Sequence, residues 1–252
     1  MRISINEITD YIKCPLMYKF MHVDRIIATK TPDEYYKEYL KLAISFYYFS
    51  MIEKKNHLFE LMLRKWGSLW FNSGMVKAFK EDYLKQKSNE AVMLLTDFNK
   101  KIASERATPI AVNFPYEAVL PGIENIHITG NIDLIKILND KTRQRETQIV
   151  FLCTSKKIPD DFMVKNRLSV TVASYVFRKT FKIKEDRIKI VGVAHKADTE
   201  TMRTGGDFNR AEKIIRNICT GIANKVFYPR TTTINCANCR YKAFCINERA
   251  LN

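Results

Sequence analysis

Apolar residues recur at helical spacing through most of the first hundred positions of the chain. A short first helix is predicted near the N-terminus, with Ser4 or Asn6 as its N-cap and Pro15 as the residue that ends the pattern. From Pro32 to Lys101 the sequence is rich in helix-forming residues, and glycine is nearly absent. This stretch predicts about three helices.

The pattern changes to that of β-strands in the middle of the chain. Three runs of β-branched and aromatic residues, separated by turn-forming residues, predict an antiparallel meander over Phe114–Leu120, Ile126–Leu138 and Thr147–Cys153. A helix is then predicted over Arg167–Thr180 and a strand over Ile188–Ala194. Helices and strands therefore alternate in the second half of the chain.

A last long helix is predicted over Asp207–Ala223, with Asp207 as its N-cap. A loop through Pro229 leads from this helix to a group of cysteines at the C-terminus. The sequence has no internal repeat and no low-complexity linker. The order of elements predicts one α/β (α+β) domain over residues 1–252, in which helices flank a central mixed β-sheet.

Basic residues strongly outnumber acidic ones. The chain contains 42 lysine and arginine residues against 27 aspartate and glutamate residues, which gives a formal net charge of +15. A charge of this size favours a polyanionic partner, nucleic acid first. A chain rich in lysine and isoleucine also fits an AT-rich genome, so DNA binding is a prediction that needs support from a site.

No apolar run approaches the roughly 20 residues of a membrane-spanning helix. The longest candidate, Leu40–Ile52, is too short and contains Ser45 and Ser50. The chain opens on a polar amphipathic pattern without a signal peptide. These features predict a cytoplasmic protein without a membrane partner, in a reducing compartment where disulfides are rare.

Four of the six cysteines have a spacing typical of metal ligands. Cys236, Cys239 and Cys245 form a C-x2-C-x5-C cluster, and Cys14 lies at the opposite end of the chain. Four soft sulfur ligands suit zinc or an iron–sulfur cluster, and either would join the two ends of the chain. Ordinary buried thiols and disulfides are the alternatives.

The remaining two cysteines, Cys153 and Cys219, have apolar neighbours in the sequence. Free cysteine behaves as a small hydrophobic residue in such surroundings. We therefore predict that both belong to the core.

Both ends of the chain resemble the iron–sulfur branch of the PD-(D/E)XK nucleases. The opening S-x-S-x-L-x-x-Y-x-x-C-P element of that branch appears here from Ser4 to Pro15, and the closing cysteines follow Phe227-Tyr228-Pro229. The branch includes the RecB-like family, the nuclease domain of the AddB helicase–nuclease subunit and the CRISPR-associated adaptation nucleases. The resemblance implies a 4Fe-4S cluster, with zinc as the alternative, on the four cysteines Cys14, Cys236, Cys239 and Cys245.

The resemblance also implies a restriction-endonuclease-like core within the single domain. The expected parts are an N-terminal cluster segment (1–31), a helical insertion (32–110), a nuclease-like core (111–226) and a C-terminal iron–sulfur segment (227–252). The insertion is the N-terminal helical block, and the last segment carries the cysteine cluster.

The catalytic motifs of the family are only partly present. Gly130-Asn131-Ile132-Asp133 matches the strand that provides a metal-binding aspartate, and Glu117 lies where the preceding strand often has an acidic residue. The next strand should carry a second carboxylate and a lysine. Phe151 and Cys153 occupy those two positions.

Two further family positions also differ. Thr171 stands where a glutamine should precede Tyr175, and Tyr47 stands where an upstream helix should supply a histidine. Hard divalent ions need several oxygen ligands, and Asp133 alone does not supply them. We therefore predict that hydrolysis is lost and that Phe151 and Cys153 make the surroundings of Asp133 dry and apolar. The alternative is that Lys156, Lys157, Glu117 or Glu146 replaces the missing groups.

Two functions follow as hypotheses. The first is a non-catalytic DNA-binding or scaffold protein that acts with protein partners in a larger DNA-processing or viral assembly. The second is an active deoxyribonuclease that uses Mg²⁺ or Mn²⁺ in a rearranged site. A third hypothesis also explains the positive charge: the protein is an assembly subunit that binds an acidic protein instead of DNA.

Overall fold

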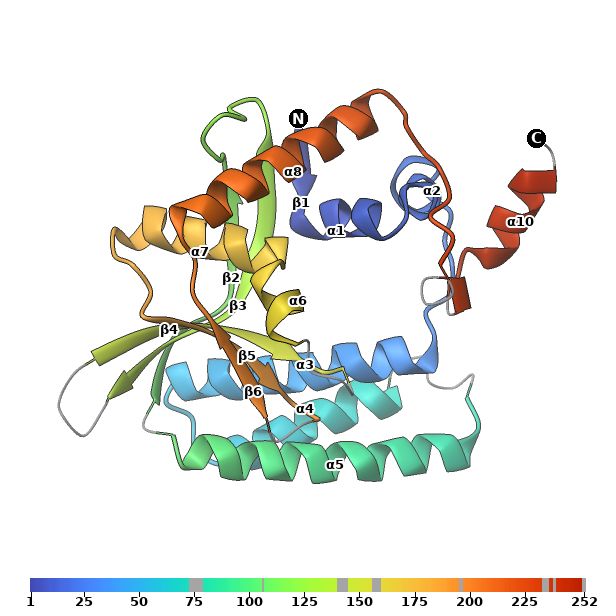
Figure 1. Cartoon of the computed structure of the whole chain (residues 1–252). Helices are drawn as coiled ribbons and strands as arrows, with labels where there is room; N and C mark the ends of the chain where they lie inside the picture. The colour runs from blue at the N-terminus through green and yellow to red at the C-terminus, as the bar shows by residue number, and fades with distance from the viewer. Residues whose placement is uncertain are drawn as a thin grey trace.

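Among the described residues, six strands form one mixed β-sheet between two groups of helices (Figure 1). The computed structural model describes residues 1–72, 79–105, 107–139, 145–155, 160–194, 197–232, 236–237 and 239–250. The strands are β1 (Arg2–Ser4), β2 (Ala107–Ala118), β3 (His127–Asn139), β4 (Arg145–Cys153), β5 (Arg187–Gly192) and β6 (Asp198–Thr201). Their order is β1-β3-β4-β5-β6, and β2 pairs with β3.

Helices precede, separate and follow the strands along the chain. The bounds are α1 (Ile5–Lys13), α2 (Pro15–Tyr18), the π-helix η1 (Lys19–Val23), α3 (Pro32–Ile52), α4 (Leu58–Asn72), α5 (Glu81–Ala103), α6 (Asp161–Lys165), α7 (Leu168–Phe181), α8 (Gly205–Ala223) and α10 (Lys242–Ala250). The three helices predicted between residues 32 and 101 are present as α3, α4 and α5. None of the helices of the described part of the chain is long and apolar enough to cross a membrane.

Capping boxes begin three of the helices. Ser4 and Glu7 form one at the start of α1, so of the two predicted N-caps Ser4 is confirmed, and Asn6 lies inside the helix. At α8, Thr204 is the N-cap and Asp207 closes the box from the third helical position. The prediction that Asp207 is the N-cap was therefore wrong, because a carboxylate also reaches back to the N-cap amide from inside the first turn.

The predicted meander is confirmed: β2 pairs antiparallel with β3, and β3 pairs antiparallel with β4. β1 is parallel to β3, β5 is parallel to β4, and β6 is antiparallel to β5, so the sheet is mixed. The short elements β1, β6 and α6 were not predicted, because so few residues carry no clear period. β2 begins at Ala107, inside the stretch assigned to the helical insertion. The division into segments stays a prediction.

The sheet is covered on both faces, and β4 contributes to two separate cores. Ile149 and Phe151 pack into the core shared with α1, α7 and α8, whereas Val150 and Leu152 pack into the core shared with α3, α4 and α5. Successive side chains of a strand point to opposite faces. A strand buried on both faces reads as a continuous apolar run, as this part of the sequence does.

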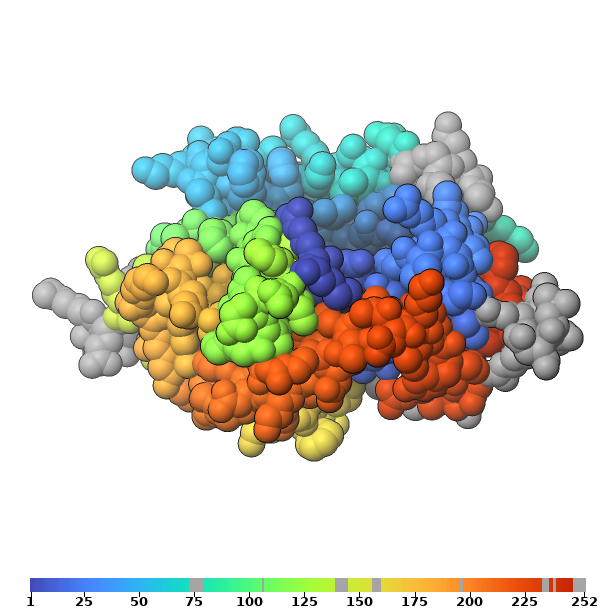
Figure 2. All heavy atoms as spheres, turned by 90° about the horizontal axis from the view of Figure 1, so that it is seen from above, coloured from blue at the N-terminus to red at the C-terminus, as the bar shows by residue number. Residues whose placement is uncertain are grey.

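Segments from near the two ends of the chain lie side by side, and both views show the segment after α8 passing next to α2 (Figures 1 and 2). The Leu16 amide donates to the Tyr228 carbonyl at 3.1 Å, and the Tyr11 hydroxyl donates to the Val226 carbonyl at 2.7 Å. The Tyr241 hydroxyl donates to the Ile26 carbonyl at 3.1 Å. These hydrogen bonds join segments more than two hundred residues apart.

Candidate functional site

A pocket of about 870 Å³ opens where β1 and the start of α1 meet α3 and the strands β2, β3 and β4. The two predicted catalytic residues, Asp133 and Glu117, both line it. Three cationic side chains, Arg2, Lys41 and Arg167, line it as well. Tertiary structure thus brings the predicted carboxylates together and surrounds them with positive charge.

Both carboxylate oxygens of Asp133 have partners within the protein. Oδ2 accepts a hydrogen bond of 2.9 Å from the Leu152 amide, and Oδ1 lies 2.8 Å from the Nζ atom of Lys41. Asp133 is only 6% exposed, and an unpaired buried carboxylate would be costly. Lys41 comes from α3, and sequence reasoning missed it because one lysine among many on a helix gives no signal of its own.

Glu117 is paired in the same way, although it is exposed. Its Oε2 atom lies 3.0 Å from Arg2 Nη2, and its Oε1 atom lies 2.8 Å from His127 Nδ1. β1 places Arg2 there, because Arg2 pairs with His127 at the edge of β3. Each acidic side chain of the pocket therefore already has a basic partner.

The surroundings of Asp133 are not dry and apolar, and that prediction was wrong. Phe151 is 7% exposed and packs into the core with α7. It forms only part of the wall, because β1 and α3 bring Arg2 and Lys41 to the same pocket. The strand sequence contains no information about residues that other elements contribute.

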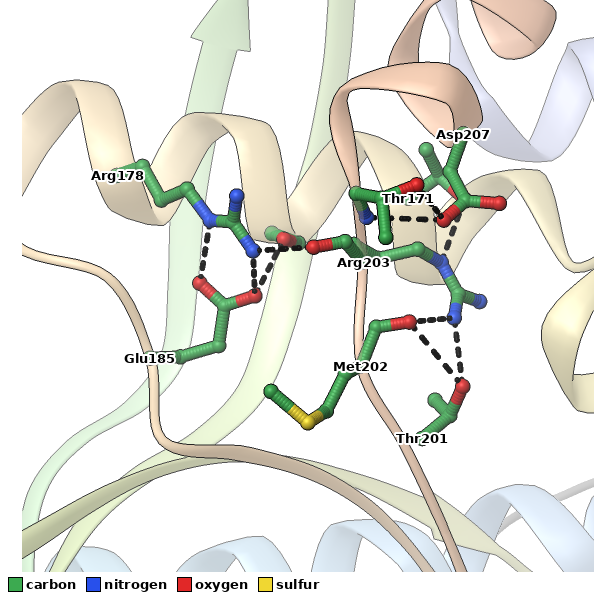
Figure 3. Close-up of polar contacts among 9 residues, drawn as sticks. Thr171, Arg178, Glu185, Thr201, Met202, Arg203 and Asp207 are labelled. Carbon is green, nitrogen blue, oxygen red and sulfur yellow. Dashed lines mark hydrogen bonds and ion pairs between the residues drawn. The ribbon is translucent and has the colours of Figure 1, made fainter.

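Three further positions of the family pattern, two of them altered, do not line the pocket. Thr171 accepts a hydrogen bond of 2.8 Å from Arg203 Nε (Figure 3), and Tyr175 packs edge-on against Phe208 with ring centres 5.7 Å apart. Tyr47 is buried in the core of α3, α4 and α5. These three side chains have structural roles.

Four side chains were proposed to replace the missing carboxylate and lysine, and they lie in different parts of the chain. Glu117 is the residue that lines the pocket. Glu146 forms an ion pair of 3.0 Å with Arg187 and does not line the pocket. Lys156 and Lys157 lie outside the described residues.

A buried arginine fixes the wall of the pocket that α7 forms. Arg203 is 1% exposed and donates to the carbonyl of Val164 on α6 as well as to Thr171 on α7. Arg178 of α7 forms an ion pair with Glu185 and donates to the Arg203 carbonyl (Figure 3). These bonds hold α6 and α7 together on either side of Arg167.

A second cavity, of about 140 Å³, lies between the two ends of the chain. All four predicted ligands line it, namely Cys14, Cys236, Cys239 and Cys245. Apolar side chains form most of the remaining wall, including Leu16, Met17 and Phe20. The resemblance predicted that these four cysteines belong to one site, and the fold brings them to one cavity.

Different elements hold the four thiols. Cys14 lies between α1 and α2, and its sulfur accepts a hydrogen bond of 3.4 Å from the Arg230 amide. The Cys239 amide donates to the Cys236 carbonyl at 3.4 Å, and Cys245 lies on α10. None of the six cysteines forms a disulfide.

The four cysteine thiols can be compared with the ligand sets of zinc and of iron–sulfur clusters. Zinc bonds of about 2.3 Å require sulfur atoms roughly 4 Å apart. Among the described side chains, no group of three or more His, Cys, Asp or Glu residues could hold a metal ion as it stands. Thiolate sulfurs are ligands of zinc and of iron–sulfur clusters alike, so the chemistry of the four cysteines suits either group.

Cys219 has the structural role predicted for it. It lies on α8, is 4% exposed and packs into the core shared with α1 and α7. Burial raises the pKa of its thiol, so the neutral form is favoured. Cys153 is half-buried and packs against the same core.

The sequence matches the PD-(D/E)XK nuclease superfamily over residues 2–246, and the chain belongs to this superfamily. The mixed sheet with helices on both faces agrees with the restriction-endonuclease-like fold expected from the sequence. Among solved structures, the chain is similar to SSO0001, with 11% identity and a TM-score of 0.41 over 97% of this chain and 85% of the other. Among curated proteins no relative matches.

Proposed function

We propose that this protein is a DNA-binding or scaffold protein built on a nuclease fold, with hydrolysis lost and a 4Fe-4S cluster between its ends. It acts in the cytoplasm within a larger DNA-processing or viral assembly. The observation that carries the proposal is the pairing of Asp133 with Lys41 at 2.8 Å and with the Leu152 amide at 2.9 Å.

This pairing bears directly on hydrolysis. Phosphodiester hydrolysis in this superfamily uses a divalent ion to generate hydroxide and to stabilise the transition state, and such an ion takes several oxygen ligands. Both oxygens of Asp133 are engaged, Glu117 is paired with Arg2, and Phe151 adds no oxygen. A metal would have to displace an ammonium group to bind Asp133.

The same arrangement supports binding of nucleic acid. The pocket presents Arg2, Lys41 and Arg167 around two carboxylates that already have basic partners. Phosphate oxygens accept strong, charge-assisted hydrogen bonds from such side chains. The formal charge of +15 adds long-range attraction for a polyanion.

The cysteine cavity supports the cofactor. Cys14, Cys236, Cys239 and Cys245 would hold the 4Fe-4S cluster, and the apolar side chains of the cavity would shield it from water. When bound, the cluster supplies iron–sulfur bonds that join the ends of the chain. The protein itself contributes the hydrogen bond from the Arg230 amide to the Cys14 sulfur, which orients this ligand.

The test is an assay of binding and cleavage on labelled single- and double-stranded DNA. We expect salt-sensitive binding and no cleavage with Mg²⁺ or Mn²⁺, for the wild type and for Asp133→Ala alike. Absence of salt-sensitive binding near physiological ionic strength would contradict the proposal and favour an acidic protein partner.

One observation favours the alternative, an active metal-dependent nuclease: Asp133 and Glu117 line the same open pocket. If this alternative holds, a divalent metal ion that binds together with DNA breaks the ion pairs Lys41–Asp133 and Arg2–Glu117. The assay then shows cleavage that depends on the metal and disappears in Asp133→Ala.

A further inference from the structure

The ion pair between Lys41 and Asp133 has a meaning beyond the loss of hydrolysis. The superfamily places a divalent cation at the aspartate of this motif, and here the Nζ atom of Lys41 lies 2.8 Å from that carboxylate. We propose that the Lys41 ammonium replaces the divalent cation and binds a DNA phosphodiester directly, so that the pocket holds DNA without metal. This inference rests on the DNA-binding function proposed above.

The ammonium group has hydrogen bonds to spare for a phosphate. A lysine carries three N–H donors, and the contact with Asp133 Oδ1 uses one of them. The side chain of Lys41 is 39% exposed and lines the pocket, so the other donors have access to a ligand there. An ion pair that served only to neutralise a buried carboxylate would not need this exposure.

The position of the ammonium is fixed from both sides. The stem of Lys41 begins on α3, a helix of 21 residues. Buried residues of this helix, such as Leu40 and Ile44, anchor it in the core of α3, α4 and α5. At the other end, Asp133 is held by the Leu152 amide on β4, at 2.9 Å. A cation held in this way loses little conformational entropy when a phosphate binds.

The rest of the pocket suits a nucleic-acid backbone. Arg2 is held against Glu117 at 3.0 Å while its side chain stays 72% exposed, and Arg167 lines the same pocket. The volume of about 870 Å³ is in the range of known ligand sites. Since both carboxylates are paired with cations, the pocket does not repel a phosphate as a bare pair of acids would.

A matched control lies one turn earlier on the same helix. Lys37 is exposed to a similar degree and forms an ion pair of 3.5 Å with Asp33. It does not line the pocket. Lys37→Ala therefore removes the same charge from α3 without touching the site.

The experiment measures the affinity for a short fluorescein-labelled DNA duplex by anisotropy, with EDTA or with Mg²⁺, at several salt concentrations. We expect the wild type to bind equally well in both conditions. Lys41→Ala should weaken binding in EDTA by about tenfold or more, because a charge-assisted contact is lost. The slope of log K against log salt should fall by about 1, whereas Lys37→Ala should change binding much less.

The metal response separates this role from a merely structural one. In Lys41→Ala the freed carboxylate of Asp133 and a DNA phosphate can share a hard cation, so Mg²⁺ should restore part of the affinity. The double variant Lys41→Ala/Asp133→Asn should lose that response. The double variant also leaves no unpaired buried charge, so it keeps the test valid if Lys41→Ala alone does not fold.

Each outcome decides the matter. Wild-type affinity that rises with Mg²⁺ would overturn the inference, and so would a Lys41 variant, single or double, that binds like Lys37→Ala. In both cases DNA binding itself would stand. If the wild type does not bind DNA at all, the DNA-binding function and the role of Lys41 are both overturned.

Discussion

In the pocket around Asp133, all four carboxylate oxygens have partners: Lys41 and the Leu152 amide for Asp133, and Arg2 and His127 for Glu117. In the cysteine cavity, by contrast, four thiols face mainly apolar side chains. The first site is complete with protein groups alone. The second places four metal-binding thiols around one cavity, and no carboxylate lines it.

The supports of the two sites differ as well. The Asp133 pocket is built on the central strands and on α3, which stay in place through two large apolar cores. The cysteine cavity is built from the two chain ends, whose own apolar cluster contains, among the described residues, four buried ones, Leu16, Met17, Phe20 and Tyr241. A small cluster of this kind gains much from a bound group, because binding energy there becomes folding energy. The comparison therefore predicts a site that needs no metal and a site that does.

The largest expected effect comes from the cysteine cavity. Cys14→Ser and Cys239→Ser should destabilise the protein equally, by several kcal/mol, because each removes one ligand of the group that joins the ends. Thermal unfolding of protein purified without oxygen measures the effect. The same samples should contain roughly four irons per wild-type chain, as a 4Fe-4S cluster requires.

Cys219→Ser is the internal control for this experiment. It changes a thiol of the core that lines neither site, so iron content should be unchanged and the loss of stability smaller. Equal damage from all three variants would remove the argument that the ends are joined by a cluster. A measurement of stoichiometric zinc without iron would show that the four cysteines bind zinc and not an iron–sulfur cluster.

The next effect comes from restoring the family pattern in β4. Phe151→Asp with Cys153→Lys should lower the free energy of unfolding by about 3 kcal/mol or more, because Phe151 is 7% exposed and packs against α7. We expect no gain of nuclease activity, because Lys41 still forms its ion pair with the Asp133 carboxylate. A double variant that folds normally and cuts DNA with Mg²⁺ would show that the pocket has kept its catalytic capacity.

A smaller effect is expected at Asp133 itself. Asp133→Asn keeps the shape of the side chain and removes the charge that Lys41 neutralises. Because Lys41 is partly exposed and water can solvate it, the cost should be about 1–2 kcal/mol. Urea unfolding measures it. If the cost matched that of the cysteine variants, the contrast between the two sites would not hold.

The smallest effect is a pH dependence of the stability that comes from Asp198, another aspartate that forms ion pairs with lysines. Burial alone would raise the pKa of the Asp198 carboxyl, but hydrogen bonds from Lys101 and Lys189 outweigh burial and lower it. The carboxylate therefore contributes stability above its unfolded pKa of about 3.9, and this contribution is lost as the pH falls through the folded pKa.

Unfolding of the wild type and of Asp198→Asn, compared across acidic pH, tests this expectation. The variant should be less stable at neutral pH, and the difference should shrink as the solution is acidified. A difference that stays constant with pH would mean that the ion pairs around Asp198 contribute no charge-dependent stability.

Much of the architecture followed from local chemistry. The capping box at Ser4, the helical period between residues 32 and 101, and the three strands of the meander can each be read from nearby residues. The C-x2-C-x5-C cluster could likewise be found from its spacing, because metal ligands recur at particular intervals. The motif Gly130–Asp133 was found from the resemblance to the nuclease family.

The sequence by itself thus determined the order of the longer elements, and it singled out Asp133, Glu117 and the four cysteines as candidate site residues. Only the tertiary structure decided what surrounds those residues: Lys41 from α3 and Arg2 from β1 reach the carboxylates, and Arg230 reaches Cys14 from the other end of the chain. Spacing within an element is fixed by the backbone period, which the sequence displays. A contact between elements depends on how whole faces pack, and no local pattern records that packing.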